Sequence, residues 1–194
     1  SSLNPVFTIG DQLAEPIVLH NPKMKKDEVN TKVIDLLKLV GIANPEGIVK
    51  RYPHELSGGM KQRIVIAMAL SCNPQLIVAD EPTTALDVTI QKQIMDLLDD
   101  IKKEFGTTIL LISHDLALVS NYADNISVMY SGHIVEKAPA KDFFRKPLHP
   151  YSIALLDSLP TRNPALKLRT IEGSPPSIQE EIFGCKFHPP LLLL

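Results

Sequence analysis

The sequence predicts an α/β fold built around a parallel sheet. Residues 76–79 and Thr107–Ile112 are short apolar runs without alternation, as in strands that are buried on both faces. Between them, residues 88–103 carry apolar side chains at helical spacing, and Gly106 follows as a stop signal. A strand, a helix and a strand in this order predict a right-handed β-α-β unit with parallel strands.

Helical patterns precede this unit. Residues 28–40 have the apolar spacing of an amphipathic helix, and Gly41 would end it. Ser57 is a good N-cap for a second helix that reaches about Ser71 and is rich in Ile, Ala, Met and Leu.

A hairpin pattern follows the unit. A short helix is expected from Asp115 to about Tyr122, and residues 126–130 and 133–137 then read as strands. Ser131-Gly132 between them is a two-residue hairpin signal. Prolines multiply beyond this point, and residues 160–176 are predicted to be an irregular tail.

Composition narrows the class of protein. The 194 residues suit one domain, or one with a small appendage, and a net charge of −2 argues against nucleic acid as the main partner. The apolar stretch Ile64–Leu70 is far shorter than the roughly 20 residues that span a bilayer. Ser1-Ser2 do not open a signal peptide, and Cys72 and Cys185 make no disulfide framework. We expect a soluble cytoplasmic domain that reaches a membrane only through a partner.

Polar side chains follow both predicted strands. Asp80 and Glu81 come after the first strand, and His114 comes after the second. Ligands gather at the carboxyl ends of parallel strands, so the sheet should bring these three side chains to one edge. Asp80 suits Mg²⁺ held through water, Glu81 could orient or deprotonate an attacking water, and His114 could contact a γ-phosphate. The alternatives are two surface acids in a turn opened by Pro82, and a structural histidine.

A second motif suits an anion. Gly58 and Gly59 let the backbone approach a ligand, and Ser57 adds a hydroxyl at the start of a helix, where free N–H groups favour negative charge. The alternative is an ordinary capped helix after a turn. Asp87 could likewise do no more than cap the helix that follows it.

Together these motifs resemble those of the ATP-binding cassette (ABC) ATPases. Residues 56–60 are similar to the signature motif, 76–81 to the Walker B strand, 85–87 to the D-loop, and His114 to the switch histidine. The resemblance covers about residues 1–137. It implies an incomplete P-loop NTPase-type parallel sheet, with an α-helical subdomain at 1–56 and the C-terminal part of the ATPase core at 57–137.

The chain also resembles one subgroup, the importers of oligopeptides, dipeptides and nickel. Met60 replaces the usual Gln of the signature motif, as in peptide importers, and residues 1–5 look like the segment after the Q-loop. Residues 138–194 would be an irregular C-terminal extension. The stretches similar to that extension are 143–144, 147–151 and 184–187.

The resemblance implies a role for each motif. Residues 57–59 would contact ATP held by a partner subunit, with Asp87 at the dimer interface, while Asp80, Glu81 and His114 would serve ATP and Mg²⁺ held by their own chain. The implied partners are a second ABC ATPase subunit, as a homo- or heterodimer, transmembrane permease subunits and, indirectly, an extracytoplasmic peptide-binding protein. The intact ATPase would energise import of oligopeptides or dipeptides from the inner face of the membrane.

One part of an ATPase site does not occur in these residues. The 194 residues contain no Gly-x-x-x-x-Gly-Lys-Ser/Thr loop, which is called the Walker A loop in P-loop ATPases. Because that loop cradles the β- and γ-phosphates, we expect this chain alone neither to bind ATP tightly nor to hydrolyse it. Cys185 resembles the first cysteine of a cluster-binding tail, but no second cysteine follows, so the ligand count does not support a metal cluster. No function is assigned to Leu191–Leu194.

Two other functions fit parts of the sequence. The chain could be the signature half of a DNA-repair or chromosome-maintenance ABC ATPase, in which a long coiled coil precedes the signature. Pro5, Pro16, Pro22 and Pro45 and the lack of sustained heptads argue against it. It could also be a non-catalytic module that docks on a membrane subunit.

Overall fold

The computed structural model describes residues 3–159, 184, 185 and 187. They form two compact units, one that ends at Asp115 and one that begins at Leu116. The predicted tail at 160–176 and Leu191–Leu194 lie outside the described residues. Within the described part, no helix has the length and apolar character needed to cross a bilayer.

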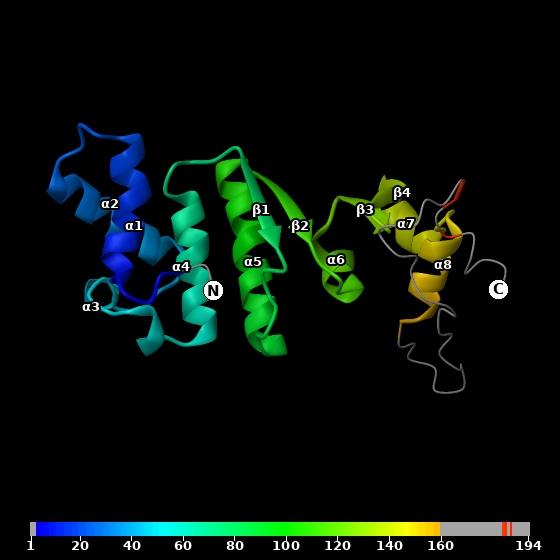
Figure 1. The fold of residues 1–194 in the computed structure, drawn as a ribbon, viewed down its shortest axis with the longest axis horizontal. Helices are drawn as coiled ribbons and strands as arrows, with labels where there is room; N and C mark the ends of the chain where they lie inside the picture. Colours follow the sequence, from blue (N-terminus) through cyan, green and yellow to red (C-terminus); the bar gives the residue numbers. More distant parts are fainter. Residues whose placement is uncertain (1–2, 160–183, 186, 188–194) are drawn as a thin grey trace. The chain divides into compact units, whose positions relative to one another are not determined.

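The first unit begins with a group of short helices (Figure 1). The amphipathic helix predicted at 28–40 is α2, and Gly41 after it has a positive φ of 71°. Contacts of α1 with α2 and α4, and of α2 with α4, bury their apolar stripes. The elements in order are α1 (Ile9–His20), α2 (Lys26–Leu39), α3 (Pro45–Ile48), the 3-10 helix η1 (Pro53–Glu55) and α4 (Gly58–Leu70).

The predicted β-α-β unit follows α4. Strands β1 (Leu76–Asp80) and β2 (Thr108–Ile112) pair in parallel, and helix α5 (Val88–Phe105) connects them. α5 buries one stripe that includes Ile94 and Leu98, and it ends at Gly106, whose φ of 64° lies in the left-handed region. The parallel pairing and both helix ends confirm the sequence prediction.

The sheet has one buried face and one exposed face, so the prediction of two buried faces is wrong for the described residues. Ile77 and Ala79 are buried, whereas the alternate positions Leu76 and Val78 are more than half exposed. On β2 the exposed positions include Leu110, which lies opposite Val78. The reason is that α5 packs on β2 from one side, and no described element covers the other.

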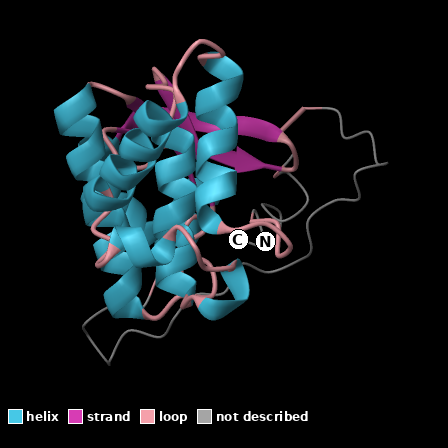
Figure 2. Ribbon diagram, turned by 90° about the vertical axis from the view of Figure 1, so that its left-hand side faces the viewer, coloured by secondary structure: helices cyan, strands magenta, loops and turns pink. Residues whose placement is uncertain are grey.

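The second unit combines a hairpin with three helices (Figure 1). Figure 2 shows the helices of the described residues in cyan and their strands in magenta. Ser131 and Gly132 join its strands with φ angles of 44° and 76°, and positive φ at both central residues is the mark of a type I′ turn. The hairpin and the helices bury a small core around Ile126, Val128 and Phe143. The elements are α6 (Leu116–Tyr122), β3 (Asn125–Tyr130), β4 (His133–Pro139), α7 (Ala140–Arg145) and α8 (Pro150–Asp157).

Candidate functional site

The candidate site lies where β1 and β2 end. Asp80 is the last residue of β1 and pairs with Ile112, the last residue of β2. One residue further, the Glu81 N–H donates to the Ile112 carbonyl at 2.9 Å, so the ladder extends beyond the strand. Glu81 itself has a φ of 45°, a left-handed conformation that is uncommon for a residue with a side chain. The chain therefore bends sharply at the first candidate catalytic residue.

The bend brings Glu81 to His114. The Glu81 Oε1 and His114 Nδ1 atoms are 2.6 Å apart, although the residues are 33 positions apart in sequence. The acid and the histidine that the sequence predicted at one sheet edge thus form one pair. The side chains remain accessible, with 41% of Glu81 and 80% of His114 exposed.

A third side chain, Thr84, joins this pair. The Thr84 hydroxyl donates to the other carboxylate oxygen, Glu81 Oε2, at 2.7 Å. This bond and the one from His114 hold the pKa of Glu81 below its usual range. The bond to Glu81 and the charge of its carboxylate raise the pKa of His114, which favours the positively charged form of the imidazole. The sequence analysis missed Thr84, and the available signal was its place three residues after Glu81 in a turn.

Asp80 stands next to this group on the exposed face of the sheet. Mg²⁺ commonly takes one or two carboxylates and completes its shell with phosphate oxygens and water, so Asp80 fits as one such ligand. Across the ranges that the structure covers, no three His, Cys, Asp or Glu side chains lie close enough to hold a metal ion by themselves. Phosphate oxygens and water would have to supply the remaining ligands.

A small cavity adjoins the Glu81–His114 pair. Its volume is about 150 Å³. Pockets for small-molecule ligands measure about 300–1,000 Å³, so this cavity has room for a few water molecules and is too small to enclose a nucleotide. It is lined by Glu81, Thr83, Thr84, Ala85, Gln91, Ser113, His114 and Asp115.

The signature residues form a separate group at the start of α4. Ser57 caps the helix, because its Oγ accepts a hydrogen bond from the Met60 N–H at 3.3 Å. A Cβ atom on Gly59 would lie 2.8 Å from Cγ2 of Ile90, closer than real contacts allow. The sequence analysis explained these glycines by the approach of a ligand alone. The structure adds a second reason, the packing of α4 against α5 in the same chain.

Asp87 belongs to this second group. Its Oδ1 accepts a hydrogen bond from the Ile90 N–H at 3.0 Å, so it is the N-cap of α5. The capping alternatives for Ser57 and Asp87 are therefore correct as descriptions of local structure. They leave the remaining N–H groups at the start of α4 available to an anion.

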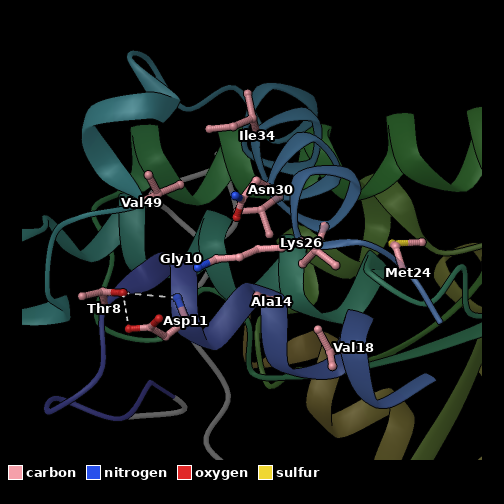
Figure 3. Close-up of a pocket in the computed structure, with 12 residues that line it drawn as sticks. Thr8, Gly10, Asp11, Ala14, Val18, Met24, Lys26, Asn30, Ile34 and Val49 are labelled. Atoms are coloured by element: carbon pink, nitrogen blue, oxygen red, sulfur yellow. Dashed lines mark hydrogen bonds between the residues drawn. The ribbon is translucent and has the colours of Figure 1, made fainter. Parts of the chain in front are cut away.

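A larger cavity lies elsewhere, among α1, α2 and Val49 (Figure 3). Its volume is about 550 Å³, and its lining is mainly apolar, with Asp11 and Lys26 as the charged side chains. None of the predicted catalytic or nucleotide-contacting residues lines it. Its size alone therefore does not make it the catalytic site.

The described part of the tail places Cys185 near one other possible metal-ligating side chain, that of His149. Cys185 Sγ lies 3.7 Å from His149 Nε2, and Phe187 is buried against Tyr130 and Tyr151.

Comparison with known proteins finds two family matches. Residues 1–84 match the family described as ABC transporter, and residues 135–190 match the C-terminal region of oligopeptide/dipeptide transporters. The chain is thus similar to members of the ABC transporter family, as the sequence motifs indicated. Its mixed architecture with a small parallel sheet is an incomplete form of the ABC ATPase fold, as predicted.

Several curated members of the ABC family are close relatives. The chain is 52% identical to the oligopeptide transport ATP-binding protein AppD of Bacillus subtilis and 50% identical to the dipeptide transport ATP-binding protein DppD of Haemophilus influenzae. In each case 97% of this chain aligns, but it spans only 58% and 57% of the relative. A solved ABC cassette, MJ0796 as a dimer bound to ADP and Pi, matches 72% of the chain and 59% of its own length, with a TM-score of 0.63 and 28% identity.

Proposed function

We propose that this chain is part of an ABC ATPase subunit that hydrolyses ATP to energise the import of oligopeptides or dipeptides. The observation that carries the proposal is the Glu81–His114 pair at the ends of two parallel strands. The peptide-transport names of the relatives support the choice of substrate.

The pair fits the hydrolysis of a phosphoanhydride. Glu81 would orient a water molecule and accept its proton as the water oxygen bonds to the γ-phosphorus and the bond to the ADP oxygen breaks. His114, whose pKa is raised, would donate a hydrogen bond to the γ-phosphate. Asp80 would hold Mg²⁺ through water, and the ion would neutralise charge on the phosphates when bound.

The signature group would serve a second subunit. Residues 57–59 begin a helix of 13 residues, and the N–H groups there can bind an anion supplied from outside the chain. The dimeric form of the solved cassette, which holds ADP and Pi, supports this arrangement. Asp87, next to the same group, would lie at the dimer interface.

The permease subunits would contact the helical part, residues 3–56. The cavity of about 550 Å³ between α1 and α2 supports this assignment, because it presents apolar surface with two charged side chains on a part that takes no role in the chemistry. The match of residues 135–190 to the C-terminal region of oligopeptide/dipeptide transporters favours the peptide importer over the repair-type ATPase.

The substitution Glu81→Gln tests the proposed chemistry. The experiment uses a longer subunit that contains this chain together with a Walker A loop. The amide cannot accept the proton of water, so steady-state ATP turnover should stop, while binding of radiolabelled ATP should persist. Glu104→Gln makes the same chemical change on an exposed residue of α5 and should leave turnover unchanged. Turnover at the parent rate in the Glu81→Gln variant would exclude Glu81 as the base.

A further inference from the structure

We propose that Thr84 is a positioning residue that orients the Glu81 carboxylate for attack by water. The inference rests on the proposed function, in which Glu81 is the general base. Thr84 touches no reacting atom itself, so its contribution would act through Glu81.

The backbone between the two residues forms a turn that brings Thr84 back to Glu81. The Thr84 N–H donates to the Glu81 carbonyl at 3.2 Å, which closes residues 81–84 into a turn. The turn starts from the left-handed conformation of Glu81, whose own N–H is bonded to Ile112. The Thr84 side chain therefore starts from a backbone position that is fixed relative to the sheet.

The side-chain bonds then fix the carboxylate. Thr84 Oγ1 donates to Oε2 at 2.7 Å, and His114 Nδ1 lies 2.6 Å from Oε1. Each oxygen has one partner, and the partners come from two different segments of the chain. Hydrogen bonds at both oxygens restrain rotation of the carboxylate about its terminal bond and favour one direction relative to the sheet edge.

The two hydrogen bonds to the Glu81 carboxylate leave room for the reaction. A carboxylate has about four lone-pair sites, so two bonds leave each oxygen a site that can accept from water. Glu81 and Thr84 both line the cavity of about 150 Å³ beside the pair. That volume accommodates water next to the clamped carboxylate.

Two rival roles give different expectations for the loss of the hydroxyl. If Thr84 only supports the turn, its loss should reduce stability and leave the chemical step unaffected. If Thr84 restrains Glu81 in a resting state, its loss should raise kcat. A positioning role predicts a lower kcat with unchanged affinity for ATP, because only the step that uses the carboxylate is affected.

The experiment compares Thr84→Val and Thr84→Ser in the longer subunit with its Walker A loop, in complex with its permease. Valine keeps the shape of threonine without the hydroxyl, and serine keeps the hydroxyl. We expect Thr84→Val to lower kcat about tenfold, as for the loss of one hydrogen bond to a charged group, with KM for ATP unchanged within about twofold. Thr84→Ser should restore most of the parent kcat. Ser120→Ala, which removes an exposed hydroxyl bonded to the Ala117 carbonyl in α6, is the control and should change neither constant.

Other outcomes distinguish failure of the proposed function from failure of the proposed role of Thr84. An inactive parent, or an active Glu81→Gln variant, would remove the proposed function itself. An active parent with an inactive Glu81→Gln variant, but with parent-like or faster turnover in Thr84→Val, would overturn the role of Thr84 alone. A raised KM at unchanged kcat, or a Thr84→Ser variant as slow as Thr84→Val, would also overturn it. Thermal unfolding of each variant shows whether a fall in kcat accompanies a loss of folded protein.

Discussion

Glu81 combines an unusual backbone conformation with a hydrogen bond at each carboxylate oxygen. Its φ of 45° costs conformational energy in any residue that carries a Cβ atom. The bond from its N–H to the Ile112 carbonyl and the closed turn to Thr84 hold the residue in that conformation. Such backbone strain is concentrated at functional sites, which agrees with the proposed role of Glu81.

This strain makes a prediction that needs no nucleotide. Glu81→Gly and Glu81→Ala both remove the carboxylate and its two hydrogen bonds, but only glycine adopts a positive φ without penalty. We expect the glycine variant of this chain to be more stable than the alanine variant by about 1 kcal/mol in chemical denaturation.

A position inside a helix, where alanine is normally more stable than glycine, provides the control. At Asp100, an exposed position inside α5, alanine should be the more stable substitution by about 1 kcal/mol, because glycine weakens a helix. If alanine were also the more stable substitution at position 81, the strained backbone would not exist in solution.

At the scale of elements, the first turns of α4 and α5 pack against each other. Gly59 lies in the first turn of α4 and Ile90 in the first turn of α5, and the contact leaves no room for a Cβ atom on the glycine. The signature residues and the helix that Asp87 caps are therefore packed as one group. A shift of either helix start would disturb the other.

The clash can be tested with paired substitutions. Gly59→Ala should lower the free energy of unfolding by about 1–3 kcal/mol, as overpacking does. Ile90→Val keeps the methyl group Cγ2 that the new Cβ would meet, whereas Ile90→Leu has no methyl group on Cβ. The cost of Gly59→Ala should therefore persist in the Ile90→Val background and shrink in the Ile90→Leu background. An equal cost in all three backgrounds, measured by urea denaturation, would show that packing does not require the glycine.

Elements with local signals were predictable from the sequence. Ser57, Gly106 and the Ser131-Gly132 turn mark their boundaries through side-chain capping or positive φ, which depend on adjacent residues only. The individual helix α1 was not predicted, because Pro16 lies inside it and proline is usually a helix breaker.

At the scale of the whole molecule, the pairing of the two strands was predictable from the sequence, but the burial of each face of the sheet was not. The parallel order of β1 and β2 follows from the helix between them, and it placed Glu81 near His114 as expected. Which faces of the sheet are covered depends on every element that packs on them. The exposed Leu76, Val78 and Leu110 show that the apolar sequence of a strand does not reveal this coverage.

The small size of the cavity beside Glu81 leads to a prediction for the whole chain. A space of about 150 Å³ cannot enclose a nucleotide, and no Walker A loop occurs in the 194 residues to cradle the phosphates. Isothermal titration calorimetry of this chain with MgATP should give a Kd of about 1 mM or weaker. A longer subunit with the Walker A loop is the control and should bind far more tightly. A Kd near 1 µM for the chain alone would contradict the incomplete site.

The bond from the Glu81 N–H to the Ile112 carbonyl has a consequence for changes in the connectivity of the chain. Because the register of β1 and β2 sets the distance between Glu81 and His114, the length and route of the connection between the strands do not. A circular permutation that opens the chain between α5 and β2 would keep the acid and the histidine together as long as the two strands still pair.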